Sequence, residues 1–187
     1  MFRRSRRLMH MAFLVVLAVD QAKAQEPTRL TVCEVFQDLQ GWSDKLIAVH
    51  GEYDFGGSHG IYAVLERDCP VNPETDGIKW GTAIWLTGSP APDNLSDLER
   101  SLHDPRSFRV LHAFTGTMIK EYWDVRAGPP FKVMATFVGI LRAGNLDTLD
   151  GGFGYMGLYP AQLKALAVRD IVVTQTSNPV SETPGAE

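Results

Sequence analysis

The chain has 187 residues and is acidic, with 22 Asp and Glu residues against 18 Lys and Arg residues. Five of the basic residues and only one acidic residue lie within residues 1–24, so the remaining chain carries a net charge of about −8. Because nucleic-acid binding depends on Lys and Arg contacts to phosphate, this charge disfavours a nucleic-acid partner. The remaining length, about 163 residues, suits a single domain with its own core.

Residues 1–24 have the three parts of a secretory signal peptide. Four arginines lie between positions 3 and 7, an apolar run covers residues 12–19, and Ala22-Lys23-Ala24 forms a small-residue cleavage site. Because spanning a bilayer takes roughly 20 apolar residues, we expect cleavage rather than a membrane anchor. The sequence therefore predicts an exported protein, periplasmic or secreted, with no stable membrane span after cleavage. The arginines leave open whether the signal is of the Sec or the twin-arginine type.

The mature chain is expected to begin with a short helix. Thr31 and Glu34 have the spacing of a capping box, and four apolar side chains follow at helical spacing, Val32, Val35, Phe36 and Leu39. Gly41 is expected to end this helix, with Cys33 on its first turn.

Three strands are predicted next, at residues 45–55, 61–65 and 82–86. The first alternates apolar and polar residues, and Gly51 in its middle predicts a bend. A glycine-rich turn joins it to the second strand, so the two form a hairpin. Cys69 lies in the loop that follows.

A helical insertion is expected around residues 91–104, with Asp93 as its cap and Pro105 as its stop. Residues 106–123 are compatible with either helix or strand. Strands are predicted at 131–142, with Gly139 as a bend, and at 162–173. A glycine-rich loop lies between these strands, and the polar residues 174–187 are predicted to be a disordered tail.

Five bent strands, a short N-terminal helix and one helical insertion predict a mainly β protein, a small OB-like barrel within residues 25–173. A β-sandwich remains an alternative. Cys33 and Cys69 are the two cysteines of the chain, and export favours a disulfide between them. Free buried thiols are the second interpretation, whereas the spacing is poor for a zinc site. We expect neither a metal nor a cofactor.

Four segments carry a resemblance to known proteins: residues 30–34, 49–53, 135–139 and 152–163. In these segments the chain resembles a group of short exported bacterial proteins with OB-like barrels and no assigned activity. The resemblance implies the barrel and supports the disulfide, and it brings no catalytic residues. Some of the similar proteins have His where Tyr155 stands here, so no histidine chemistry is carried over at that position.

The chain has no P-loop or H-E-x-x-H motif, and its glycine-rich turn at residues 56–60 joins two predicted strands rather than a strand and a helix, as a nucleophile elbow would. Aromatic residues gather at predicted strand ends and loops, and OB barrels bind ligands in such places. The candidate ligand-binding residues are Tyr62, Trp85, His59, Phe153 and Tyr155. The alternative is that these aromatic side chains fill the core.

The preferred hypothesis is a non-enzymatic binding or interaction domain whose partner is an oligosaccharide, a peptide or an envelope protein. The alternative is an envelope hydrolase that uses a His/carboxylate pair. His50 and Glu52, on one face of the first strand, are the candidates for that pair. An exposed polar strand face explains the same two residues without any chemistry.

Overall fold

The computed structural model describes residues 26–55, 62–88, 92–122, 131–148 and 150–175. The predicted signal peptide lies outside these residues, as do His59 and the tail from residue 176 onward. None of the helices that the structure describes is both long enough and apolar enough to cross a membrane.

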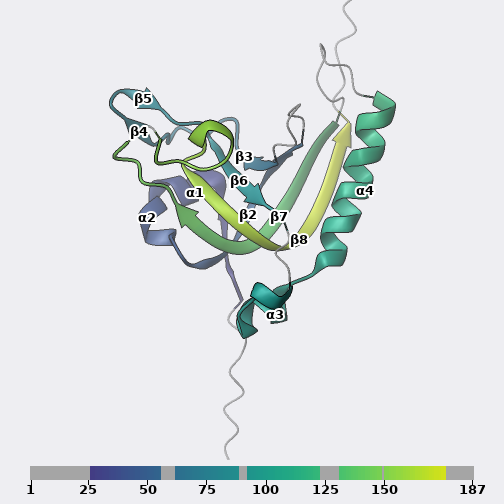
Figure 1. The fold of residues 1–187 in the computed structure, drawn as a ribbon. Coiled ribbons are helices and arrows are strands. Elements are labelled where there is room, and N and C mark those ends of the chain that lie inside the picture. Colours follow the sequence, from purple (N-terminus) through teal and green to yellow (C-terminus); the bar gives the residue numbers. More distant parts are fainter. Residues whose placement is uncertain (1–25, 56–61, 89–91, 123–130, 149, 176–187) are drawn as a thin grey trace, which may run out of the picture.

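Five strands form a closed barrel (Figure 1), which confirms the predicted OB-like fold class. Its strand order is β2-β3-β6-β8-β7, and pairing of β2 with β7 closes the circle. The strands are β2 (Leu46–Asp54), β3 (Ala63–Leu65), β6 (Ala83–Thr87), β7 (Phe131–Ala143) and β8 (Ala161–Gln175). The first and last residues of each strand are within two residues of the predicted ones.

Alternation of apolar and polar residues decides which side chains fill the barrel. The inward residues of β2 are buried together with Phe137 and Leu141 of β7. Along one edge of β2, the residues before Gly51 pair with β1 and the residues after it pair with β3. At Gly139 the register between β7 and β8 shifts, and an added Cβ would collide with the backbone of Lys164. Both glycines therefore allow the strands to curve, as the sequence predicted.

The segment before the barrel contains a strand that the sequence did not predict. This strand, β1 (Thr28–Thr31), runs parallel to β2. The expected helix follows as two short pieces, α1 (Val32–Gln37) and α2 (Leu39–Trp42), and the Thr31–Glu34 capping box is confirmed. The prediction that Gly41 ends the helix is wrong. Asp38 breaks it instead, because its backbone leaves the helical region and its carboxylate accepts a hydrogen bond from the Gly41 amide.

The helical insertion is longer than predicted. It contains a short 3-10 turn, η1 (Pro92–Asn94), and two helices, α3 (Asp97–Leu102) and α4 (Pro105–Tyr122). Ser96, not Asp93, caps α3. Pro105 begins α4 rather than stopping a helix, because proline lacks an amide hydrogen that the first turn would leave unpaired. Figure 1 shows α4 lying along β8, with α3 at one end of the barrel.

A small hairpin, β4 (Glu74–Thr75) and β5 (Ile78–Lys79), projects from the connection between β3 and β6. The same connection holds Cys69, which is joined to Cys33 of α1 as the sequence predicted, with 5.4 Å between their Cα atoms. The bridge therefore fastens this connection to the helix at the start of the domain.

Candidate functional site

The connection between β7 and β8, residues 144–160, folds back over the outer face of the barrel. Phe153 and Tyr159 pair across it, with backbone hydrogen bonds of 2.8 and 3.2 Å. Gly154 lies between two rings, because an added Cβ would be 2.8 Å from Tyr159 and 3.1 Å from Trp85. Its φ of +74° also favours glycine. The glycines of this loop thus let the backbone pack directly against the Trp85 ring of β6.

The β4–β5 hairpin is attached to the same loop through Trp80. The indole Nε1 of Trp80 donates a 2.8 Å hydrogen bond to the Thr75 hydroxyl, which in turn donates to the carbonyl of Leu146. Gly152 packs against the Trp80 ring. Trp80 is buried as a result, and the hairpin and the loop lie beside each other at one end of the barrel (Figure 1).

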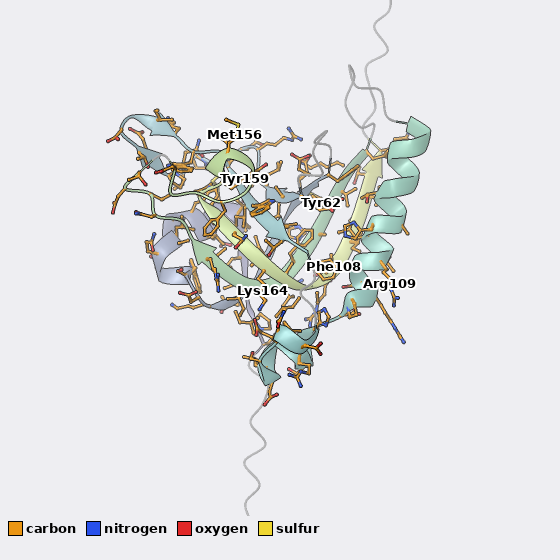
Figure 2. The ribbon with its side chains drawn as sticks, in the orientation of Figure 1. Tyr62, Phe108, Arg109, Met156, Tyr159 and Lys164 are labelled. Atoms are coloured by element: carbon orange, nitrogen blue, oxygen red, sulfur yellow. A yellow bond between two sulfur atoms is a disulfide. The ribbon has the colours of Figure 1, made fainter. Side chains whose placement is uncertain are left out.

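An open groove of about 480 Å³ runs between the hairpin and the loop. Its walls come from the hairpin and from residues 157–159, and most of its lining is apolar. Three large aliphatic side chains are exposed here, Ile78 and Leu158 in the groove and Met156 beside it, with exposed fractions of 53%, 59% and 75%. Figure 2 shows Met156 and Tyr159 on this loop. We call this groove and its three exposed aliphatic residues the apolar groove.

The Tyr159 phenol stays neutral near this groove. Partial burial raises its pKa, and the nearby Asp54 carboxylate raises it further. A neutral phenol offers both a hydrogen-bond donor and an acceptor. The groove therefore has a polar group beside its apolar wall.

The structure divides the aromatic residues that the sequence grouped together. Trp85 and Phe153 both belong to the surface at the β7–β8 loop, and the backbone of Tyr155 lies in the same loop in the 3-10 turn η2 (Tyr155–Gly157). The Tyr155 side chain, like His59, lies outside what the structure describes. Tyr62 is separate, because its ring lies parallel to that of Tyr53 at the barrel mouth beside α4.

His50 and Glu52 lie on the outer face of β2, as predicted, but each has other partners. Arg67 donates hydrogen bonds of 2.7 and 3.1 Å to the two carboxylate oxygens of Glu52, and Lys132 lies 3.2 Å away. Burial by itself raises the pKa of Glu52, but the hydrogen bonds and charges of Arg67 and Lys132 outweigh it and lower the pKa overall. Glu52 is therefore an ionised partner of two cations.

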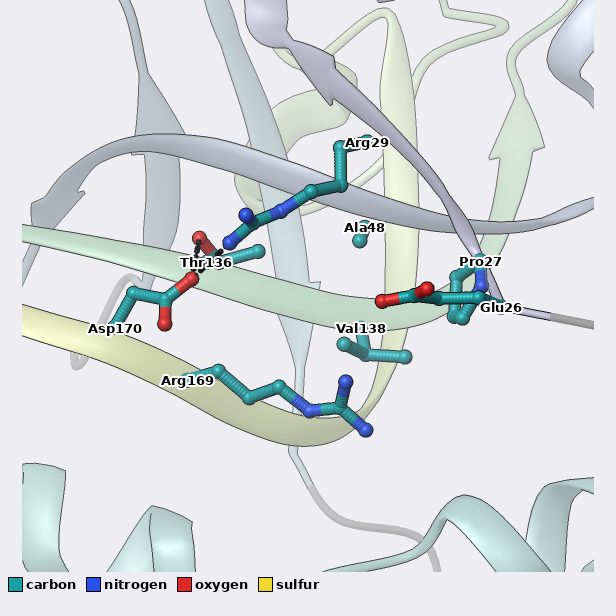
Figure 3. Close-up of a pocket in the computed structure, with 8 residues that line it drawn as sticks. All are labelled: Glu26, Pro27, Arg29, Ala48, Thr136, Val138, Arg169 and Asp170. Atoms are coloured by element: carbon teal, nitrogen blue, oxygen red, sulfur yellow. Dashed lines mark hydrogen bonds and ion pairs between the residues drawn. The ribbon is translucent and has the colours of Figure 1, made fainter.

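His50 belongs to a polar chain of contacts on the same outer face, and Figure 3 shows the other members of this chain, Arg29, Thr136 and Asp170. Its Nδ1 lies 3.1 Å from the Thr136 hydroxyl, which donates a 3.2 Å hydrogen bond to the Asp170 carboxylate. Asp170 also pairs with Arg29. These contacts border a hollow of about 230 Å³ with Ala48 and Val138 at its floor.

Asp170 reaches this hollow because β8 contains a bulge. Its φ is +51°, and the register between β7 and β8 shifts at this point. A bulge turns an extra side chain to one face of a sheet, so Arg169 and Asp170 both line the hollow.

Two features described above were not predicted from the sequence, namely the exposed residues of the apolar groove and the bulge at Asp170. Ile78 lies in the small β4–β5 hairpin, and Met156 and Leu158 lie in the β7–β8 loop. All three are isolated aliphatic residues, and the available signal was their position near several glycines rather than in an alternating pattern. The contacts of Asp170 depend on a bulge that has no glycine to mark it.

No protein-family model, no curated protein and no solved structure matches this chain.

Proposed function

We propose that the protein is an exported, non-enzymatic interaction domain that binds a protein partner through the apolar groove. The observation that carries the proposal is the exposure of two large aliphatic side chains, Ile78 and Leu158, in one groove, with a third, Met156, exposed on the same loop as Leu158. Exposed apolar side chains gathered at one place mark an interaction site. A peptide segment with two or three apolar side chains would bury them.

The groove favours a peptide over an oligosaccharide. A sugar that binds an aromatic platform needs an exposed ring face, but Trp80 is only 7% exposed. The loop backbone at Gly154 covers part of the Trp85 ring. The large side chains that are most exposed in the groove, Ile78 and Leu158, are aliphatic, and they match the apolar side chains of a protein. The net charge of the mature chain further favours a neutral or basic partner.

Two features support export as part of this proposal. The sequence has the signal-peptide pattern at residues 1–24. The pairing of Cys33 with Cys69 suits an oxidising compartment, where disulfides persist. N-terminal sequencing of the exported protein tests it: the expected first residue is Gln25, and a membrane-bound product that still begins with Met1 would contradict it.

The hydrolase alternative has less support, because Glu52 is engaged by Arg67 and Lys132 rather than by a histidine. His50 contacts Thr136 instead.

Peptide selection tests the groove directly. The immobilised protein would select from a displayed peptide library, and the affinity of the enriched peptides would be measured by calorimetry. Leu158→Asp should weaken binding roughly 10- to 100-fold, because burying one large aliphatic side chain contributes about 1.5–3 kcal/mol.

Val172→Asp is the matched control, since Val172 is 54% exposed on β8 and does not line the groove. This variant should bind the selected peptides as the unmodified protein does. Equal losses in both variants, or enriched peptides without apolar side chains, would refute the proposal.

A further inference from the structure

A second cavity lies between α4 and the mouth of the barrel, away from the apolar groove. It has a volume of about 130 Å³ and is mostly apolar. Phe108 and Leu111 of α4 form one wall, and Leu86 and Phe137 of the barrel form the other. Tyr62 and Phe108, both in the lining, lie between the sheet and α4 in Figure 2.

Aromatic rings form much of the lining. Tyr53 packs against Phe137, with 5.5 Å between ring centroids, and lies parallel to Tyr62 at 6.1 Å. Tyr62 in turn meets the edge of His112 at 5.4 Å. Rings at these separations offer both faces and edges to a further ring, so the lining suits a flat apolar molecule.

The Tyr53 phenol brings a polar group to this lining. The residue as a whole is 3% exposed. Burial raises the pKa of Tyr53, and Tyr62 and Asp54 raise it further, so the phenol stays neutral and can both donate and accept.

We propose that this cavity binds a monocyclic aromatic molecule that carries a single hydroxyl or carbonyl group. The ring lies among Phe108, Leu111 and Phe137, and the polar group forms a hydrogen bond with the Tyr53 hydroxyl. The size agrees, because an engineered apolar cavity of about 150 Å³ in another protein stays dry and binds benzene. The site is distinct from the apolar groove, so it stands whether or not the groove binds a peptide.

Titration of the full chain with phenol, followed by calorimetry and thermal unfolding, tests the proposal. We expect saturable one-to-one binding with a Kd below about 1 mM, which is within reach of a ligand of this size. Cyclohexanol should bind roughly two- to ten-fold more weakly, since it lacks the ring electrons that pair with aromatic walls. Absence of phenol binding, or equal affinity for the two molecules, would overturn the proposal.

Two variants locate the site. Tyr53→Phe keeps the ring and removes the hydroxyl, so phenol should bind roughly five- to ten-fold more weakly while benzene binds as before. Leu111→Trp should fill the cavity and abolish phenol binding, whereas Val110→Trp, on the exposed face of the same helix, should leave it unchanged. Should Leu111→Trp fail to fold, the Tyr53→Phe comparison still decides. Unchanged phenol affinity in Tyr53→Phe would place the ligand elsewhere.

Discussion

Reduction of the Cys33–Cys69 disulfide should destabilise the domain strongly without preventing it from folding. The bridge spans 36 residues of sequence. In the chain-entropy model, a closed loop of this length lowers the entropy of the unfolded chain enough to stabilise the fold by about 4 kcal/mol. For a domain of this size that corresponds to a fall in Tm of roughly 8–16 °C.

The reduced protein should still fold because a second contact joins the same two segments. The Cys33 amide, in the first turn of α1, donates a 2.9 Å hydrogen bond to the Glu66 carboxylate. This bond satisfies an amide that the helix itself leaves unpaired, and it does not depend on the sulfur atoms. Loss of the bridge therefore makes unfolding easier and leaves the native contacts of α1 in place.

Circular-dichroism melting with and without a phosphine reductant measures the effect. The Cys33→Ala/Cys69→Ala double variant should match the reduced protein, and the reductant should not change the Tm of that variant. A fall in Tm of less than about 3 °C on reduction would refute the loop-entropy reasoning, because it would correspond to a stabilisation of only about 0.8–1.5 kcal/mol for a chain of this length.

Three further substitutions probe other parts of the structure. Gly154→Ala should cost about 1–3 kcal/mol in denaturant unfolding, because alanine is strained at φ +74° and its Cβ would press on Trp85; unchanged stability would mean that the loop does not pack as described. Phe137→Ala should cost about 3–5 kcal/mol by the same assay, since it empties a fully buried position at the barrel centre, and a loss below 1 kcal/mol would argue against that packing. Glu99→Gln should cost about 1 kcal/mol at neutral pH. Hydrogen bonds from Lys164 and Ser96 lower the pKa of Glu99 to about 2, so the unmodified protein should lose this contribution as the pH falls from 4.5 towards 2, and the variant should show a flatter stability profile over that range.

The barrel strands were predictable because each one has a side that must be apolar. In β2 and β7 the alternation marks both the strand and the face that enters the core. The first strand, β1, was not predictable, because its four residues lead straight into the Thr31 cap and show no alternation of their own. The start of α4 was misjudged because proline is compatible with both the end of one helix and the first turn of the next.

Composition identified aromatic candidates for the site but not the side of the sheet to which each belongs. The Leu86 amide donates a hydrogen bond to the Tyr62 carbonyl, and both of these residues line the cavity at the barrel mouth. Ala63, the residue after Tyr62, is paired with Trp85, the residue before Leu86, and Trp85 lies on the outer face. A shift of one residue thus separates the cavity from the outer surface, and such a register cannot be read from residue types alone.

Closure of the barrel also has a consequence for how the chain folds. The pairing of β2 with β7 joins Leu46 to Ile140, about 90 residues apart, and long-range contacts of this kind slow folding. Because β7 pairs with both β2 and β8, we expect the barrel to remain open until that one strand docks. The Cys33–Cys69 bridge lies entirely N-terminal to β7, so it can form before that strand closes the barrel.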